Sequence, residues 1–401
     1  MKEIKVGVIG AGGRSASYIR SVPVEFAHRV RLMAVADPHE ESRRRFSEHF
    51  ANGTPPRHYE DGALMLGREE LDALVIGSPN YTHADLALAA FRLKIPILLE
   101  KPVATSLEDC RRLWQGYLAA GQPTVLVGFV LRYTPFYSKV KELLDDNRVG
   151  QILSLDADEN IVPAVSSVFY RGWRRYDKYS GGFMVEKCSH DFDILNWLSG
   201  AKVRRVFSIA KRTHLTPRPR AQQHERLDAE VTRRMAFDYG DKAVKEFMDV
   251  TNSESLYEAE SDVPDHQAVM LEFDNGILST FTACHIQPRS TRRLRIFGSQ
   301  GAIEGDIERN KIMVDIPFED RDGYTTRQID IPHDENDGHH GGDSVINEAF
   351  WGAATGREVE IRAGLKEGIE AVVVGLAAEE SKKDGLPVEL EPMRRHVFGN
   401  D

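Results

Sequence analysis

The sequence has few cysteines, no long apolar run and no excess of basic residues. Three cysteines occur in 401 residues, without the spacing of a metal site, so we expect a reducing compartment and no disulfides. No stretch of about 18 apolar residues is present that could span a membrane. Lysine and arginine number 52 against 62 acidic residues, a net charge of −10, which argues against nucleic acid as a partner.

The length of the chain predicts more than one domain. A chain of 401 residues exceeds what one ordinary hydrophobic core supports, so two domains are expected. The first residues, Met1-Lys2-Glu3-Ile4-Lys5-Val6, enter a strand at once. We therefore expect no leader peptide and a cytoplasmic location.

A predicted strand at Lys2–Ile9 runs directly into a glycine turn and then a helix. The turn residues are Gly10, Gly12, Gly13, Arg14 and Ser15. Such a turn lets the backbone approach a pyrophosphate at the N-terminus of a helix. The match to Gly-x-Gly-x-x-Gly is weak by itself, and Ser15 occupies the third glycine position.

Asp37 follows the next predicted strand, Val30–Ala36. An acid at this strand end binds the ribose hydroxyls of NAD in dinucleotide folds, although the same side chain could cap the following helix. Because an acid repels a 2′-phosphate, NAD is favoured over NADP. Arg43 and Arg44, one or two turns on, keep NADP as the alternative.

The first third of the chain goes on alternating strands and helices. The expected strands are Leu71–Gly77, Ile95–Leu99 and Thr124–Val130, and the expected helices are Asp85–Leu93 and Leu107–Ala120. This alternation predicts an α/β domain with a parallel sheet and helices on both faces.

Polar residues follow these three strands, where open α/β sheets bind ligands. They are Ser78, Pro79, Asn80 and His83 after the first strand, Glu100 and Lys101 after the second, and Arg132 and Tyr133 after the third. Lys101 comes between an apolar strand and a proline, so a surface role is the less favoured reading, and bonds of this X–Pro type are sometimes cis. A packing role suits His83 as well as ligand binding does.

The densest group of ionisable residues runs from Gly181 to Gly200, on a predicted helix. Glu186 and His190 stand at i and i+4, so they share one face of such a helix. His190 suits an acid/base role, since the pKa of histidine is ordinarily near neutrality, and Glu186 or Asp193 could orient it. A structural histidine in the core is the alternative reading of His190.

From Gln151 onward the pattern changes to strands with little helix between them. These strands are Gln151–Asp158, Val203–Ala210, Gln267–Phe273, Ile277–His285, Arg292–Phe297 and Lys311–Ile316. The turn Asp274-Asn275-Gly276 indicates antiparallel pairing. The charged stretch Lys211–Asp265 is expected to be a surface insertion, a lid or a subunit contact, with arginines reaching an anionic substrate as the alternative.

Taken together, the motifs resemble the glucose-fructose oxidoreductase / inositol dehydrogenase (Gfo/Idh/MocA) family. They are Gly10-x-Gly12, Asp37, Pro79-Asn80-x-x-His83, Glu100-Lys101-Pro102, His190-x-x-Asp193-x-x-x-Trp197-x-x-Gly200, the Gly338–Asp343 run and the Gly364–Gly385 helix. The resemblance implies a Rossmann domain over residues 1–133 and an α+β domain with a large open antiparallel sheet over residues 134–401. It also implies that the 364–385 helix packs toward the N-terminal domain and that the protein is a homodimer or homotetramer.

The family resemblance also implies roles for single residues. Lys101 matches a lysine that contacts substrate and nicotinamide, and His190 matches the usual acid/base. Glu186 stands where many members have aspartate, and Lys187 follows it. The candidate substrate ligands are Lys101, Arg132, Tyr133, Trp173, Arg174, Glu186, Asp193 and His339, although the aromatic ones are equally ordinary core or rim residues.

The sequence therefore predicts an NAD-dependent dehydrogenase that acts on a ring hydroxyl of a sugar, glycoside or cyclitol. We expect no metal, because His339 and His340 beside Asp343 lack the spacing of a zinc site. One alternative is a glycosidase in which bound NAD oxidises the sugar transiently. Another is a non-catalytic regulator that senses NAD or sugar.

Overall fold

The computed structural model describes residues 3–50, 54–170, 172–216, 260–318, 323–332 and 337–399. The chain forms two compact units. The first unit comprises Met1–Lys139, Pro332–Val373 and Pro392–Asp401, and the second comprises Val140–Ile331 and Val374–Glu391. These units divide the chain differently from the two predicted domains, whose boundary after residue 133 stays a prediction. None of the described helices is both long and apolar enough to cross a membrane.

The first unit is built on a parallel sheet. Its described strands are β1 (Ile4–Ile9), β2 (Val30–Ala36), β3 (Arg57–Tyr59), β4 (Ala73–Ile76), β5 (Ile97–Leu99) and β6 (Val125–Val127). They lie in the order β3-β2-β1-β4-β5-β6, and the neighbouring strands pair in parallel. This order confirms the predicted Rossmann arrangement, in which the crevice for a dinucleotide opens where the strand order reverses, beside β1.

Helices and short 3-10 turns connect these strands. They are α1 (Gly13–Arg20), α2 (Val24–Ala27), α3 (Glu40–Phe50), α4 (Gly62–Arg68), η1 (Asn80–Thr82), α5 (His83–Phe91), α6 (Leu107–Ala119) and η2 (Val130–Tyr133). The predicted strand Thr124–Val130 is too long, because β6 stops at Val127 and the chain turns into η2. At this point Gly128 lies against a side chain: a Cβ on it would be 2.8 Å from Oε1 of Glu100.

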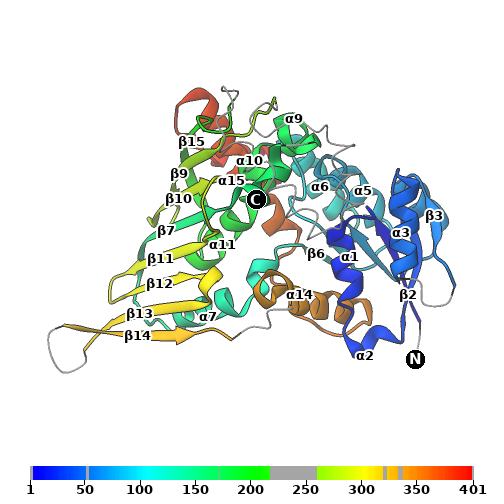
Figure 1. Cartoon of the computed structure of the whole chain (residues 1–401), viewed down its shortest axis with the longest axis horizontal. Helices are drawn as coiled ribbons and strands as arrows, with labels where there is room; N and C mark the ends of the chain where they lie inside the picture. The colour runs from blue at the N-terminus through cyan, green and yellow to red at the C-terminus, as the bar shows by residue number, and fades with distance from the viewer. Residues whose placement is uncertain are drawn as a thin grey trace. The chain divides into compact units, whose positions relative to one another are not determined.

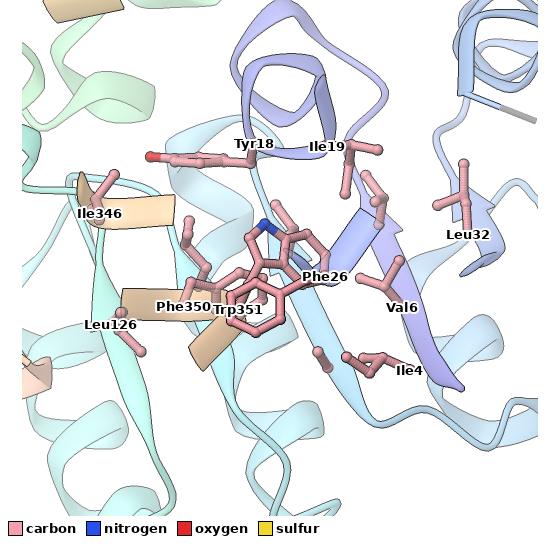
Figure 2. Packing of buried hydrophobic residues seen from close by; sticks show 14 of the residues in the cluster. Ile4, Val6, Tyr18, Ile19, Phe26, Leu32, Leu126, Ile346, Phe350 and Trp351 are labelled. Atoms are coloured by element: carbon pink, nitrogen blue, oxygen red, sulfur yellow. The ribbon is translucent and has the colours of Figure 1, made fainter. Parts of the chain in front are cut away.

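A later part of the chain completes the core of the first unit. Helix α14 (Gly338–Ala354) contributes Ile346, Phe350 and Trp351, which pack with Val6 of β1 and Tyr18 of α1 (Figure 2). This helix was not predicted from the sequence. The predicted Gly364–Gly385 helix is present as α15 (Leu365–Asp384), and a Cβ on its Gly368 would lie 2.6 Å from a methyl carbon of Val103. The last helix is α16 (Glu391–Phe398).

The second unit is built on a large open sheet. Its described strands are β7 (Ile152–Asn160), β8 (Val203–Lys211), β9 (His266–Phe273), β10 (Leu278–Cys284), β11 (Arg293–Gly298), β12 (Ala302–Asp306), β13 (Lys311–Pro317), β14 (Tyr324–Asp330) and β15 (Val388–Glu389). They run in the order β14-β13-β12-β11-β7-β10-β9-β8-β15 (Figure 1). The six predicted strands are confirmed. Among the described strands β10 and β7 pair in parallel and the other pairs are antiparallel.

Short helical segments precede or connect these strands. They are α7 (Pro135–Asp145), α8 (Pro163–Ser166), η3 (Ser167–Tyr170), η4 (Gly172–Arg175), α9 (Asp177–Ser180), α10 (Phe183–Glu186), α11 (Ser189–Ser199) and η5 (Ile307–Arg309). Helix α11 packs on the sheet through Phe192, whose ring centroid lies 5.5 Å from that of Phe281 on β10. This packing fixes the part of the chain that carries Glu186 and His190.

Most of the predicted insertion Lys211–Asp265 lies outside the described residues, including Arg218, Arg220, Arg226, Arg233 and Arg234, the arginines considered for an anionic substrate. Its described ends are held together by Asp265. Oδ2 of Asp265 accepts hydrogen bonds from the backbone N–H groups of Thr213, His214 and Leu215, at 2.9, 2.6 and 2.9 Å.

His285 makes the stability of the second unit depend on pH. Its side chain is fully buried beside Tyr170, and burial lowers its pKa from 6.5 to about 3. Between these pH values the unfolded chain binds a proton that the folded chain does not, so stability falls as the pH drops through this window. From pH 6.5 to pH 5 we expect the wild type to lose about 2 kcal/mol more than His285→Gln. Denaturant unfolding of both proteins at the two pH values checks this, and equal losses would contradict it.

Candidate active site

The glycine turn after β1 leaves open space at the N-terminus of α1. Gly10 has φ +89°, and a Cβ on it would lie 2.5 Å from the backbone nitrogen of Ser78, so only glycine fits. A Cβ on Gly12 or Gly13 would meet no other atom within 4 Å. Ser15 is buried, and a Cβ on Gly77 would lie 2.4 Å from its Oγ, so a glycine at the end of β4 makes room for this serine. The turn therefore fits the pyrophosphate of a dinucleotide.

Asp37 is fixed at the end of β2. Its Oδ2 accepts the backbone N–H of Ala11 at 2.9 Å, and its Oδ1 accepts that of His39 at 2.9 Å. The carboxylate thus joins the glycine turn to the start of α3. Carboxylate oxygens have further lone pairs, so these bonds leave acceptor sites for ribose hydroxyls.

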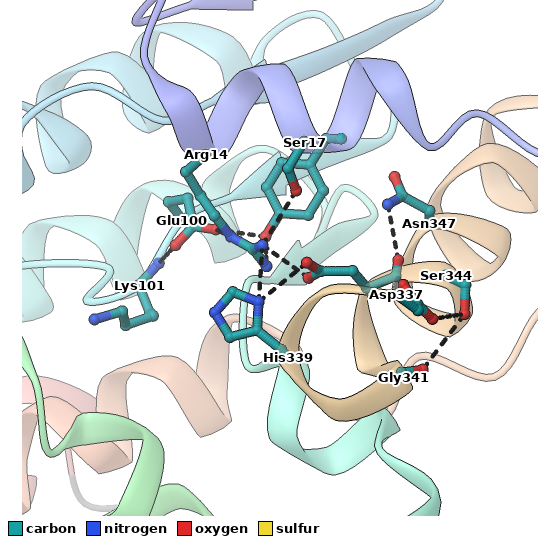
Figure 3. A network of polar contacts seen from close by, with 11 residues as sticks. Arg14, Ser17, Glu100, Lys101, Asp337, His339, Gly341, Ser344 and Asn347 are labelled. Atoms are coloured by element: carbon teal, nitrogen blue, oxygen red, sulfur yellow. Dashed lines mark hydrogen bonds and ion pairs between the residues drawn. The ribbon is translucent and has the colours of Figure 1, made fainter. Parts of the chain in front are cut away.

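The arginine of the turn is bound by protein groups from three segments (Figure 3). The Arg14 guanidinium donates through Nε to Oε1 of Glu100 at 2.7 Å, through Nη1 to Oδ1 of Asp343 at 2.7 Å, and through Nη2 to the Tyr18 hydroxyl at 2.8 Å. Burial would lower the pKa of Arg14, but the neighbouring Tyr18, Glu100 and Asp343 raise it overall. The structure thus places Arg14 as a link between α1, the end of β5 and α14; cofactor contact by Arg14 stays a prediction.

Glu100 supports the backbone of Lys101. Oε2 of Glu100 accepts the backbone N–H of Lys101 at 3.0 Å, and the Tyr18 hydroxyl donates to Oε1. Burial raises the pKa of Glu100, but the charge of Arg14 and the bond from Tyr18 lower it overall, so this carboxylate is ionised. The Lys101–Pro102 peptide bond is cis. The Lys101 side chain points away from the Arg14 guanidinium (Figure 3).

His83 connects the segments that follow β4 and β5. It is fully buried, with Nδ1 2.8 Å from the carbonyl oxygen of Pro102 and Nε2 2.8 Å from that of Ser78. The structure therefore favours the packing role that the sequence left open. Asn80, after Pro79, begins η1 and is also buried. Cofactor contacts by these strand-end residues stay predictions.

Arg132 and Tyr133 hold the segment before α15. Both are buried on η2. Nη1 of Arg132 donates to the carbonyl oxygen of Arg362 at 2.5 Å, and the Tyr133 hydroxyl accepts the backbone N–H of Arg362 at 3.0 Å. Both side chains thus have a structural role, and the substrate contacts predicted for them rest on the sequence alone.

His339 stands at a left-handed turn that opens α14, with φ +51°. Its Nδ1 lies 3.0 Å from Oδ2 of Asp343, while 46% of its side chain is exposed. Burial would raise the pKa of Asp343, but His339 and Arg14 lower it to about 2. Among the residues that the structure describes, no three His, Cys, Asp or Glu side chains gather as metal ligands.

In the second unit, Glu186 and His190 do not share one continuous helix. The prediction of a single helix over this stretch is wrong, because α10 ends at Glu186 and α11 begins at Ser189. The N–H groups of Lys187 and Cys188 both point to the carbonyl of Phe183, at 2.9 and 3.4 Å, which ends the hydrogen-bond ladder of α10.

The predicted acid/base residues of this unit are nonetheless all buried. Glu186 is 5% exposed, His190 7% and Asp193 1%. Oε1 of Glu186 accepts a hydrogen bond from Nε of Arg174 at 2.9 Å, and the Arg174 guanidinium lies 4.4 Å from the centre of the Trp173 ring. One face of Trp173, a candidate substrate ligand in the sequence, is therefore covered by arginine.

Sequence reasoning missed several residues of these networks. Tyr18 lies four residues after Arg14 on α1, so helical spacing could have suggested their contact. Glu159 and Arg292, which surround the turn after α10, carry no such local signal. Their partners lie on other strands and helices.

Comparisons with known proteins agree with this architecture. A model described as "Oxidoreductase family, NAD-binding Rossmann fold" matches residues 4–129, and one described as "Oxidoreductase family, C-terminal alpha/beta domain" matches residues 141–390. Both are models of the Gfo/Idh/MocA family.

Individual relatives have low sequence identity to this chain. YteT of Bacillus subtilis (strain 168), a provisionally assigned oxidoreductase, is 24% identical over 359 residues, 82% of this chain and 83% of its own. Inositol 2-dehydrogenase 2 of Saccharopolyspora erythraea is 32% identical over 203 residues, which cover 50% of this chain and 55% of that protein. The structure of levoglucosan dehydrogenase with NADH superposes with a TM-score of 0.74 at 18% identity, covering 97% of this chain and 99% of that one, so it shows a shared fold. The chain therefore belongs to the Gfo/Idh/MocA family and is an oxidoreductase with an NAD-binding Rossmann domain.

Proposed function

We propose that this protein transfers hydride from a ring secondary hydroxyl of a sugar, glycoside or cyclitol to the nicotinamide of NAD. The proposal is supported chiefly by the contacts at the end of β5. There Glu100 accepts the backbone N–H of Lys101 and also binds Arg14 of the glycine turn. Relatives named inositol 2-dehydrogenase and levoglucosan dehydrogenase support the substrate class.

The roles of the side chains follow from what alcohol oxidation needs. When bound at the glycine turn and Asp37, NAD would supply the acceptor for the hydride of the carbinol carbon. His190 takes the proton of the hydroxyl, since the pKa of histidine ordinarily suits proton exchange near neutral pH. The Lys101 ammonium stabilises the alkoxide as it develops. Glu186 orients His190 or accepts a hydrogen bond from a neighbouring hydroxyl.

A panel of cyclitols, free sugars and glycosides tests the proposal. The purified protein with NAD should produce NADH, followed at its absorbance band, from at least one member. Cleavage of a glycoside without net NADH would indicate the glycosidase alternative. NAD or sugar binding with no turnover of any compound would indicate a sensor.

NAD is the proposed cofactor rather than NADP. Arg43 is buried and donates to the backbone carbonyl of Asp37, and Arg44 pairs with Glu41 and Glu48. Both arginines that favoured NADP thus have partners within the protein. The carboxylate of Asp37 is therefore the group that we propose discriminates between NAD and NADP.

The Asp37→Asn variant should shift the cofactor preference. The amide keeps the size and one acceptor oxygen but removes the charge that repels a 2′-phosphate. We expect the ratio of kcat/KM for NAD to that for NADP to fall at least about tenfold, since hydrogen bonds to charged groups contribute about 1.5–3 kcal/mol. Asp85→Asn, at an exposed position on α5, is the control. An unchanged ratio of kcat/KM values would show that Asp37 does not distinguish the ribose 2′-hydroxyl of NAD from the 2′-phosphate of NADP.

We also propose a homo-oligomer that forms through the open face of the second unit's sheet. Strand register places Met270, Leu278 and Phe297 on one face, and they are 60%, 59% and 43% exposed. Exposed apolar side chains gathered on one sheet face are typical of interaction surfaces. A cytoplasmic location remains an expectation from the sequence.

The double variant Met270→Asp/Phe297→Asp should dissociate the oligomer, because two carboxylates would have to be buried between the copies. Light scattering after size-exclusion chromatography measures the mass. Leu118→Asp on α6, where the leucine is 43% exposed, is the matched control and should leave the mass unchanged. A double variant with the mass of the wild type would contradict an interface on this face.

A further inference from the structure

The turn between α10 and α11 carries a charge that the proposed reaction does not use. Nζ of Lys187, in this turn, lies 2.8 Å from Oε1 of Glu159 on β7. The other carboxylate oxygen of Glu159 pairs with Nε of Arg292. The same Nε lies 3.2 Å from Oδ1 of Asp191, in the first turn of α11. We call these four residues the Glu159 cluster; it connects the sheet to the turn and to α11.

The Glu159 cluster is buried and balanced in charge. Glu159, Asp191 and Arg292 are 4%, 5% and 9% exposed, and the Lys187 side chain is 20% exposed. Burial raises the pKa of Glu159, but Arg292 and Lys187 lower it overall. Two cations therefore face two anions, and each oxygen of the Glu159 carboxylate meets a different cation.

The short helix beside this cluster needs outside support. Helix α10 has four residues, and a single turn of helix is not stable by itself because nucleation is costly. At its start, the backbone N–H of Met184 donates to Oε1 of Glu379 on α15 at 2.9 Å. At its end comes Lys187, after which α11 restarts with the N–H groups of Asp191 and Phe192 on the carbonyl of Cys188, both at 3.0 Å.

A buried ion cluster of this kind is better suited to fixing one arrangement than to adding stability. Desolvation offsets most of the attraction between buried charges, so apolar residues of the same volume often stabilise a protein as well or better. The contacts of the Glu159 cluster instead specify how the turn sits on β7. On either side of that turn stand Glu186 and His190.

We propose that Lys187 is a positioning residue, which through Glu159 fixes the turn between α10 and α11 and thereby the placement of Glu186 and His190. This inference rests on the proposed function, in which these two side chains act on the substrate. It explains why a lysine follows the acid at this point of the sequence. Lys187 itself does not contact the reacting groups in this account.

Four variants test the role of Lys187: Lys187→Met, Glu159→Gln, the double variant of both, and Lys187→Arg. The double variant removes one cation and one anion and leaves the Arg292–Asp191 pair, so we expect its thermal stability to return toward that of the wild type. Its kcat should nevertheless stay at least about tenfold low, since small displacements of catalytic groups are costly. The Kd for NAD should not change in any variant, and Lys187→Arg should keep most of the turnover.

Lys141→Met, which removes a surface ion pair with Asp145 on α7, is the matched control and should behave as the wild type. Wild-type kcat in the Lys187→Met/Glu159→Gln double variant would overturn the inference, provided that His190→Ala is inactive. Should His190→Ala also turn over normally, the proposed function would fail and the positioning role with it. The two failures are thus distinguishable.

Discussion

Replacing Lys101 by alanine is expected to lower kcat by at least about a hundredfold, the scale on which loss of one group that stabilises a developing oxyanion is felt. The ammonium is the charge that the account places against the alkoxide, and alanine removes it. The backbone of Lys101 is held by Glu100 and does not depend on the side chain. Steady-state kinetics with a substrate from the panel, together with titration of NAD, measures both effects.

NAD binding separates this role from a purely structural one. The glycine turn and Asp37 are untouched in Lys101→Ala, so the Kd for NAD should stay within about threefold, a change of less than 1 kcal/mol. Lys366→Ala, at an exposed lysine on α15, is the control for loss of a positive charge in the first unit. Turnover near that of the wild type in Lys101→Ala would remove Lys101 from the chemistry.

The second large effect is expected for His190→Ala, which should also lower kcat by at least about a hundredfold because a positioned acid/base contributes 10²–10⁴. The variant should lose the part of the kcat–pH profile that reports the histidine. It should bind NAD as the wild type does, because the cofactor turn lies in the first unit. Rates at several pH values, with the substrate saturating, give the comparison.

A structural histidine at this position would behave differently. In that case His190→Ala would lower the unfolding temperature and leave the shape of the kcat–pH profile unchanged. His266→Ala, which removes a half-exposed histidine of the same unit, controls for the loss of an imidazole elsewhere. A profile identical to the wild type, at any overall rate, would show that the proton goes to another group.

The strands of this protein were largely predictable, for a local reason. β1 and β2 are apolar, β-branched runs that end at glycine or at Asp37-Pro38, and these signals depend only on neighbouring residues. β12 (AIEGD) and β14 (YTTRQID) were missed because they mix polar and apolar residues without strict alternation. β14 is at the edge of the sheet and has one neighbouring strand, so little selects an apolar pattern there.

Local sequence signals did not predict helix α14 or the break between α10 and α11. α14 opens with His339, His340 and Gly341 at positive φ, so its start has the composition of a loop. The stretch from Phe183 to Ser199 reads as one helix in sequence, because Lys187 is a good helix former. The break coincides with a tertiary contact that the local sequence does not show, the ion pair of Lys187 with Glu159 on β7.

The site shows the same division between local and distant information. The positions of Lys101, Asp37 and the glycine turn follow from strand ends, which the sequence marks. The role of Arg14 does not, since its partners Glu100 and Asp343 stand 86 and 329 residues away. Arg14 belongs to the glycine motif, and its guanidinium is bound by two carboxylates of the protein.

The most direct test of the central claim follows hydride itself. A substrate found with the panel would be prepared with deuterium at the oxidised ring carbon and incubated with the enzyme and NAD. The account predicts deuterated NADH and a keto product in equal amounts, measured by mass spectrometry. Consumption of the substrate with no deuterium in NADH, or with release of an aglycone and no net NADH, would contradict it.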